Sequence, residues 1–303
     1  MCLVCSAGGQ APPPLEAMRR EPRIPVRLHC HVDSVFAFQN PSSGQSHVED
    51  EPFERKRDLD ILQRLGMVPG AVRPADEMML SLFESIPDTQ GICRYDGVSA
   101  EVWRGCPVAG KGSYESVRAQ GLGAVIPVRG EEEKTRAKTE TVTEVYAASE
   151  LRIRPHHLMC LACFHGGKGG IFPIPEDNLY EVIDVVQKNP VIPILLVSGC
   201  CQVCPPCSHY DPETNWCVAK IGAGLRDEKK DLDVLQMLGL WYGDRLLARE
   251  LFGLLFERIP STRSVCAYGD GVVRAREWTI CGGPDGNPDY VRACAVGLGI
   301  PGI

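Results

Sequence analysis

The chain has 303 residues, of which 44% are hydrophobic and 23% charged, and its net charge is −7. This length suffices for two domains that each bury a core, and an acidic chain lacks the positive field that nucleic-acid binding requires. The longest apolar runs fall far short of the ~20 residues of a membrane-spanning helix, and no secretory signal opens the sequence. These features exclude nucleic acid and membrane as partners, and they predict a cytoplasmic, globular protein.

Fifteen cysteines are present. Because thiols stay reduced in the cytoplasm, so many cysteines indicate metal binding or redox chemistry rather than a disulfide framework. Residues 1–23 contain the pair Cys2 and Cys5 but no apolar periodicity. We expect this segment to be a mobile tail in which the pair has no role.

Two halves of the chain share blocks of sequence. The block Asp58 to Gly66 returns as Asp231 to Gly239, an offset of 173 residues (231 minus 58), and Phe83 to Pro87 returns as Phe256 to Pro260 at the same offset. A repeated block of this length indicates a tandem duplication. We expect two packed lobes that pair within the molecule about an approximate twofold axis.

Each half also repeats a pair of helices. In the second, Leu232, Leu235 and Leu238 recur at helical spacing, and a following helix ends before Pro260. A further amphipathic helix precedes an apolar run over 191–197 that has the length of a strand. The predicted fold class is therefore α+β and helix-rich, in two tandem related lobes.

The predicted domains follow from this repeat. Residues 24–128 form a degenerate repeat lobe, and residues 151–303 form a cysteine-rich metal-binding lobe. Residues 129–150, rich in Glu, Lys, Arg and Thr, are a charged linker, either solvated or an exposed helix. Four cysteines recur in both halves and are assigned to structure, with a second metal in each lobe as the alternative: Cys93, Cys106, Cys266 and Cys281.

The start of the repeat aligns less regularly. Residues 26–29 can be matched with residues 153–156, which makes His29 the counterpart of His156 and gives the second copy 46 extra residues (173 minus 127). That excess contains a loop over 198–217, so we expect a thiol cluster only in the second lobe.

The loop over 198–217 predicts a metal site. Thiolates bind soft or borderline metals, and two cysteines with two residues between them can bend round one ion. A second Cys-x-x-Cys pair and two adjacent histidines lie about forty residues upstream. The candidate ligands are Cys160, Cys163, Cys200, Cys201, Cys204, Cys207 and Cys217, with His156 and His157.

Two metals are compatible with this set. Cys160-x-x-Cys163 with Cys204-x-x-Cys207 would make a tetrahedral zinc site. Cys201-x-x-Cys204-x-x-Cys207 instead has the spacing of a bacterial ferredoxin run. This second pattern favours an iron–sulfur cluster of the 4Fe-4S type, and the candidate cluster ligands are Cys160, Cys201, Cys204, Cys207 and Cys217.

The sequence Arg-Pro-His-His-Leu-Met-Cys over 154–160, followed by Cys-x-x-Cys-Pro and a further cysteine, resembles a family of small bacterial and archaeal proteins of unknown function. The resemblance covers residues 151–240 and implies metal or iron–sulfur binding. The residues it shares with the family are His156, His157, Cys160, Cys201, Cys204 and Cys217. The chain departs from the family by adding Cys163, Cys200 and Cys207 and the whole duplicated lobe.

Three functions remain open. An iron–sulfur protein would serve electron transfer or redox sensing with a redox partner protein. A structural zinc protein would bind a partner through its surface. A metalloenzyme would keep an open metal position, with His156 or His157 as acid or base.

Overall fold

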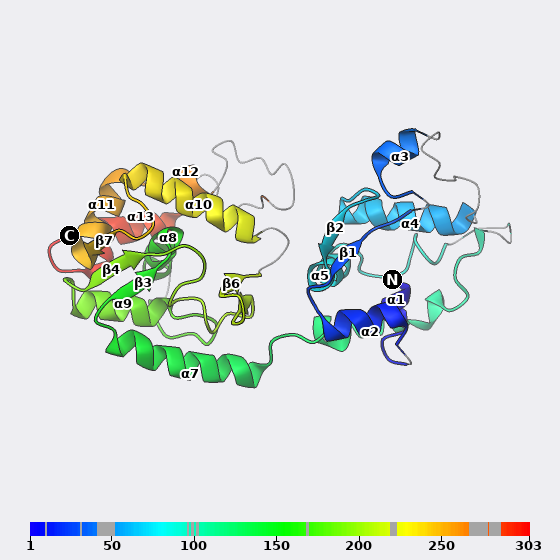
Figure 1. The fold of residues 1–303 in the computed structure, drawn as a ribbon, viewed down its shortest axis with the longest axis horizontal. Helices are drawn as coiled ribbons and strands as arrows, with labels where there is room; N and C mark the ends of the chain where they lie inside the picture. Colours follow the sequence, from blue (N-terminus) through cyan, green and yellow to red (C-terminus); the bar gives the residue numbers. More distant parts are fainter. Residues whose placement is uncertain are drawn as a thin grey trace. The chain divides into compact units, whose positions relative to one another are not determined.

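The computed structural model describes residues 1–9, 11–30, 32–40, 52–95, 97, 100, 103–167, 170–218, 223–266, 278 and 286–303. The chain divides into two compact units, Met1–Val128 (unit 1) and Arg129–Ile303 (unit 2). Helices predominate in both units and the sheets are small (Figure 1), which confirms the α+β, helix-rich fold class. Among these residues, none of the helices combines the length and the apolar character needed to span a membrane.

Unit 1 packs short helices against a two-stranded antiparallel sheet in which Pro25 pairs with Pro74 and Arg27 with Val72. Its elements are α1 (Cys2–Cys5), α2 (Pro13–Arg20), β1 (Pro25–Arg27), α3 (Val35–Gln39), α4 (Pro52–Leu65), β2 (Val72–Pro74), α5 (Ala75–Ser85), η3 (Ala109–Lys111), α6 (Ser113–Gln120) and η4 (Leu122–Ala124).

The segment expected to be a mobile tail contains α1 and α2. Val4 and Leu15 are fully buried in the core of unit 1, and the Arg19 guanidinium donates hydrogen bonds to the carbonyl oxygens of Ala7 and Val125. The prolines that made this segment resemble a loop occupy the first turn of α2, where proline leaves no helical hydrogen bond unmade. These residues are therefore part of the fold of unit 1.

Unit 2 contains a three-stranded sheet of order β3-β4-β7, in which β3 is parallel and β7 antiparallel to β4. A short hairpin, β5-β6, follows β4. The elements are α7 (Glu131–Ala147), β3 (Leu151–Ile153), α8 (Pro155–His165), α9 (Leu179–Lys188), β4 (Pro193–Leu196), β5 (Tyr210–Asp211), β6 (Trp216–Cys217), α10 (Ala223–Leu238), β7 (Arg245–Leu247), α11 (Ala248–Arg258), α12 (Arg263–Cys266), α13 (Pro288–Ala295) and η6 (Gly297–Gly299).

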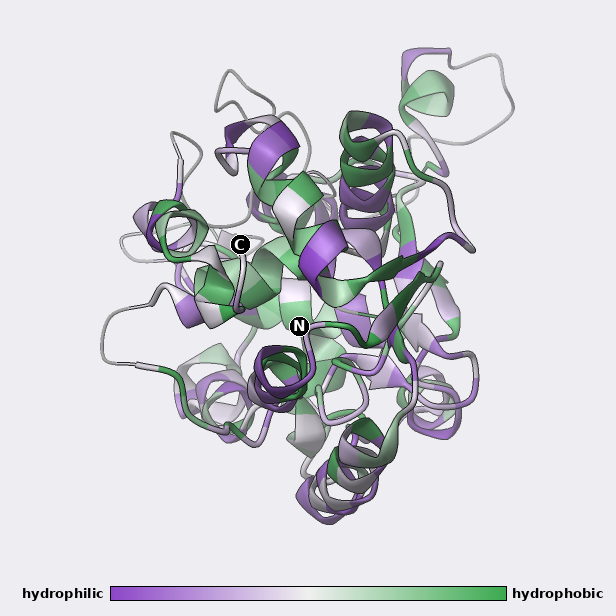
Figure 2. Cartoon of the chain, turned by 90° about the vertical axis from the view of Figure 1, so that its left-hand side faces the viewer, coloured by the Kyte–Doolittle hydropathy of each residue, from purple (hydrophilic) through white to green (hydrophobic). Residues whose placement is uncertain are grey.

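Helix α8 lies at the centre of unit 2 and contacts α9, α10 and α13 (Figure 1). Leu158, Met159, Leu161 and Ala162 are all buried, which is the pattern of a helix that has neighbours on every side. The outer helices instead carry hydrophobic and hydrophilic stretches side by side, as Figure 2 shows. The elements that surround α8 therefore hold its side chains in fixed directions.

Residues 129–150, expected to be either a solvated linker or an exposed helix, contain helix α7 of unit 2. Val145 is buried in the core. The Lys138 ammonium lies 2.8 Å from the Glu181 carboxylate and donates to the Asp177 carbonyl oxygen. The helix thus packs on α9 through a face that contains both apolar and charged side chains. The charged residues on this face give the sequence the composition of a linker.

Equivalent backbone hydrogen bonds occur within each unit, and they revise the expected alignment of the two halves. Elements β2 and α5 lie 173 residues before β7 and α11, with the same lengths. Strand β1, however, bonds to β2 as β4 bonds to β7: Ala75 N–H donates to Ile24 as Ala248 N–H donates to Ile192. Strand β1 therefore occupies the place of β4, and the alignment of residues 26–29 with 153–156 is wrong.

Two expectations change with this alignment. His29 follows β1, is exposed and bonds through Nδ1 to Asp33 at 2.8 Å, so it is not the counterpart of His156 in α8. The connection from β1 to α4 covers residues 28–51 and that from β4 to α10 covers residues 197–222, which are of similar length. The cysteine loop is therefore a differently composed connection rather than part of a 46-residue insertion.

Candidate metal centre

A buried carboxylate organises the first turn of α8. Asp231, on α10, has no exposed surface and accepts hydrogen bonds from Arg154 Nε at 2.9 Å and Nη2 at 2.5 Å. It also accepts from the His156 backbone N–H and faces His156 Nδ1, each at 2.8 Å. The backbone bond satisfies one of the donors that a helix leaves free at its start, so the same carboxylate caps α8 and orients His156.

The proton on His156 can be placed from these contacts. Burial lowers the pKa of His156, against the raising effect of Asp231, so the ring is neutral near pH 7. Burial would raise the pKa of Asp231, but His156 and Arg154 lower it, so the carboxylate is ionised and can only accept. Nδ1 of His156 therefore carries the proton, and Nε2 keeps a lone pair for a metal or an acid.

The adjacent His157 points to the cysteine loop. Its Nδ1 lies 3.1 Å from Cys201 Sγ, and the sulfur atoms of Cys201 and Cys204 are 4.0 Å apart. The ligand atoms of these three residues all lie within 4.8 Å of one another. They are therefore close enough to hold a metal ion.

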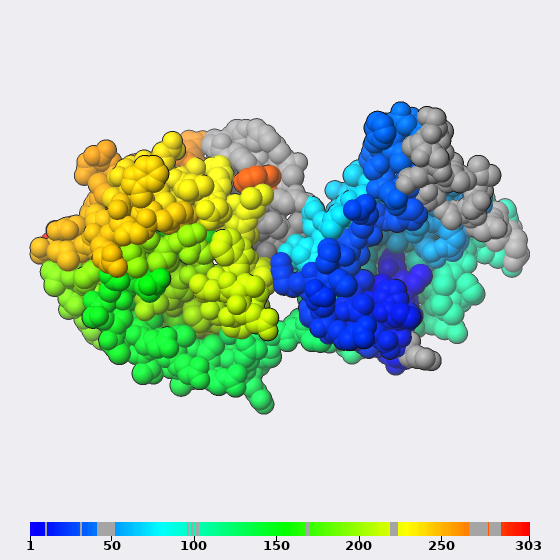
Figure 3. Space-filling view, viewed as in Figure 1, coloured from blue at the N-terminus to red at the C-terminus, as the bar shows by residue number. Residues whose placement is uncertain are grey.

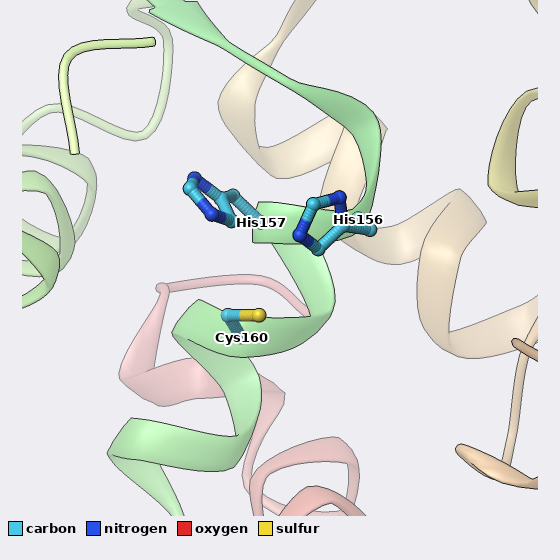
Figure 4. A group of neighbouring side chains, drawn as sticks. All are labelled: His156, His157 and Cys160. Atoms are coloured by element: carbon cyan, nitrogen blue, oxygen red, sulfur yellow. The ribbon is translucent and has the colours of Figure 1, made fainter. Parts of the chain in front are cut away.

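A second group shares the same imidazole. His156, His157 and Cys160 also have ligand atoms within 4.8 Å of one another. Figure 4 shows the two imidazoles at the start of α8 and the Cys160 thiol on the next turn below them. Because His157 belongs to both groups, it links the first turns of α8 to the cysteine loop.

Two neighbouring segments hold the loop in place. The guanidinium of Arg129, just before α7, donates to the carbonyl oxygens of Pro205 and Cys207, and Asn178 donates to the carbonyl of Gln202 at 2.8 Å. At Gly199 the backbone has φ +78°, and a Cβ would press against the Trp216 ring. The yellow-green part of unit 2 in Figure 3, to which this loop belongs, lies on the surface.

The other predicted ligands take different positions. Cys200 is buried and interacts with the Cys204 thiol. Cys207 Sγ accepts a hydrogen bond from the His209 N–H at 3.4 Å, and Cys163 Sγ one from the Asn287 side chain at 3.5 Å. Cys217 lies in β6, opposite Tyr210. In the part of the chain that the structure describes, these four do not belong to the two groups around His157.

Burial determines the chemistry of the thiols. It raises the pKa of Cys201 well above the usual range, and the pKa of Cys204 is also raised, chiefly by its hydrogen bond to Cys200. A neutral thiol is a poor nucleophile, whereas a bound cation stabilises the thiolate directly. The pair is therefore suited to binding a metal rather than to catalysis without one.

Sequence reasoning missed Asp231 and Arg154. The signal is present in the sequence, because Val234, Leu235 and Leu238 follow Asp231 at the helical spacings i+3, i+4 and i+7. All four residues are buried on one face of α10. The apolar pattern of Leu232, Leu235 and Leu238 instead begins with a residue that is 50% exposed. A carboxylate on the apolar face of a helix requires a buried partner, and the Arg of Arg-Pro-His-His was the candidate.

Comparison of the chain with protein-family models, with curated proteins and with solved structures finds no match. The resemblance carried by residues 151–240 therefore remains a prediction. The centre is defined by the geometry of its own side chains.

Proposed function

We propose that unit 2 is a metal-binding unit in which Cys201, Cys204 and His157 bind one ion, with Cys160 as the fourth ligand. The observation that carries this proposal is the convergence of two thiols and an imidazole from segments more than forty residues apart. Four ligands leave no open position, so the ion fastens α8 to the cysteine loop.

The spacing of the sulfur atoms favours a single ion of the zinc type. Zinc–sulfur bonds are about 2.3 Å long, so two thiolates on one tetrahedral zinc lie about 3.8 Å apart. The sulfurs of Cys201 and Cys204 are 4.0 Å apart. In a cuboidal iron–sulfur cluster each thiolate binds a different iron, which holds the sulfurs farther apart than two ligands of one ion.

An iron–sulfur cluster is the second candidate. The spacing Cys201-x-x-Cys204-x-x-Cys207 favours it, as does the resemblance carried by residues 151–240. In that case the function is electron transfer or redox sensing in the cytoplasm with a redox partner protein. The third possibility, an enzyme, needs an open metal position beside the neutral ring of His156.

One set of variants separates the two metals. Protein purified without oxygen is assayed for zinc, iron and acid-labile sulfide, and its visible spectrum is recorded. Single-ion binding predicts that Cys201→Ser loses about one equivalent of zinc while Cys207→Ser, in the same loop, keeps it. A cluster predicts iron and sulfide in near-equal amounts and their loss in both variants. Full metal content in Cys201→Ser would contradict both candidates.

A further inference from the structure

Unit 1 contains a group of cysteines that the candidate metal centre does not use. Helix α1 carries Cys2 and Cys5, and its hydrogen bonds from Cys5 to Met1 and from Ser6 to Cys2 make this segment helical. Residues at i and i+3 of a helix lie on one face. Val4 anchors the helix in the core of unit 1, and α1 contacts α6.

Backbone contacts bring Cys93 and Cys106 together, and Arg94 forms an antiparallel bridge with Gly105. The Cys106 N–H donates to the Cys93 carbonyl oxygen at 2.8 Å. Gly105 has φ +84°, and a Cβ there would collide with the same carbonyl, so only glycine allows this close approach. Cys93 is buried, and Cys5 and Cys106 pack against the same core.

Helix α6 links the pair in α1 to the other pair: it contacts α1, and its Glu115 accepts a hydrogen bond from the N–H of Thr89, whose carbonyl oxygen accepts one from the Cys93 N–H. Burial raises the pKa of Cys93 to about 11, and the charges of Cys2 and Cys106 add to this rise while Arg57 opposes it. Burial likewise raises the pKa of Cys5, with Cys2 and Cys106 adding to it. Each pair therefore lies within electrostatic reach of the other.

Unit 2 repeats the arrangement. The sequence Met1-Cys-Leu-Val-Cys-Ser-Ala-Gly-Gly matches Met-Cys-Leu-Ala-Cys-Phe-His-Gly-Gly over 159–167, so that Cys5 matches Cys163. Cys163 and Cys266 both act on the ionisation of Tyr290, so each of them lies near that side chain. Cys266 is 173 residues after Cys93, whereas Cys281, the match of Cys106, falls outside the described residues. The same pairing of a Cys-x-x-Cys helix with a distant cysteine thus occurs twice.

We propose that Cys2, Cys5, Cys93 and Cys106 form a second metal site, which binds one zinc-type ion through four thiolates. Two Cys pairs distant in sequence are the usual ligand pattern of structural zinc. The double negative charge of zinc with four thiolates is partly offset by Arg57, which acts on Cys93. The site has no open position, so its role is to fasten α1 to the backbone at Cys93 and Cys106.

Coordination requires movements of these side chains. In the described residues, the groups whose ligand atoms all lie within 4.8 Å are the two that contain His157. Among the described residues, no three of the four thiols of unit 1 form such a group, so binding one ion requires them to move closer together. This proposal uses other residues in another unit than the candidate metal centre, and either can fail alone.

The test measures zinc in the full chain, tagged at its C-terminus and kept reduced. In a Cys201→Ser/Cys204→Ser background, which removes the thiols of the candidate metal centre, about one equivalent of zinc is expected to remain. Adding Cys2→Ser/Cys5→Ser should lower it to below about a tenth. The matched control is Cys30→Ala, a buried cysteine of the same unit, which should keep the metal.

A second measurement stands even if the variants fail to fold. Alkylation of the unmodified protein is followed by mass spectrometry, with and without a zinc chelator. The site predicts that Cys2, Cys5, Cys93 and Cys106 are protected together and become reactive together when the chelator is added. Protection that the chelator does not change, or zinc content unchanged by Cys2→Ser/Cys5→Ser, would overturn the proposal.

Discussion

Replacement of Asp231 by leucine should destabilise unit 2 severely. Asp231 accepts four hydrogen bonds, two from Arg154 and two from His156. The Arg154 side chain is only 4% exposed. In Asp231→Leu the buried Arg154 guanidinium keeps its charge but loses the carboxylate that pairs with it. Removing one partner of a buried ion pair lowers the free energy of unfolding by about 3–5 kcal/mol. Asp231→Asn keeps the shape and one acceptor oxygen, and should cost about 2–3 kcal/mol.

The assay must report on unit 2 alone, because two units need not unfold in one transition. Hydrogen exchange of peptides from α8 and α10, measured over a urea series, gives the free energy of opening for this region. With a slope of about 2 kcal/mol per molar urea, the leucine variant should unfold at roughly 1.5–2.5 M less urea. His156 and Arg154 lower the pKa of Asp231 against burial. The stabilisation is therefore present at neutral pH and is lost as pH falls through the folded pKa, below the ~3.9 of unfolded aspartate.

The matched control lies two residues further along the same helix. Asp233 pairs with Lys229 at the surface, and its replacement by asparagine should cost less than about 1 kcal/mol. An Asp231→Leu variant that is no less stable than Asp233→Asn would show that the buried cluster does not hold α8 to α10.

Two further pairs of variants compare matched positions of the two units. The hydroxyl groups of Tyr114 and Tyr290 each donate a hydrogen bond, at 2.7 Å, to the carbonyl of the residue that closes α5 or α11. Each Tyr→Phe change should destabilise its own unit by about 1–3 kcal/mol, measured by hydrogen exchange of α5 or α11. An effect below about 0.5 kcal/mol would mean that these hydrogen bonds are dispensable. Gly70 and Gly243 both have positive φ, but a Cβ at Gly70 would meet the Asp33 carbonyl, whereas one at Gly243 meets nothing. Replacement by alanine should therefore lower the free energy of unfolding by about 1 kcal/mol at Gly243 and by clearly more at Gly70. Equal urea midpoints for the two variants would contradict this interpretation.

The elements predicted best from sequence are those fixed by local pattern. The repeated helices ended where glycine and proline indicated, at Gly66 and Gly239 and before Pro87 and Pro260. The three-residue strands are different, because hydrogen-bonding partners far along the chain define them. Strand β1 is recognisable only from its bonds to β2, and a match of four residues with 153–156 was too short to outweigh them.

The candidate metal centre was predictable in its residue types but not in its selection of ligands. Spacing alone gave nine candidates, and the structure brings five of them into the two groups around His157. On α8, the direction in which each side chain points determines which cysteine belongs to these groups. Cys160 faces the imidazoles of the first turn, whereas Cys163, nearly one turn later, faces Asn287.

Helix α8 of unit 2 and its match α1 of unit 1 place their cysteines differently in the two proposed sites. In unit 2 the helix begins with Arg154 to His157 and so presents imidazoles and Cys160 to the cysteine loop. In unit 1 the matching helix α1 carries Cys2 and Cys5. Both of these cysteines belong to the site proposed with Cys93 and Cys106. The same Cys-x-x-Cys helix would thus supply both cysteines to one four-thiolate site in unit 1, and divide its cysteines between two surroundings in unit 2.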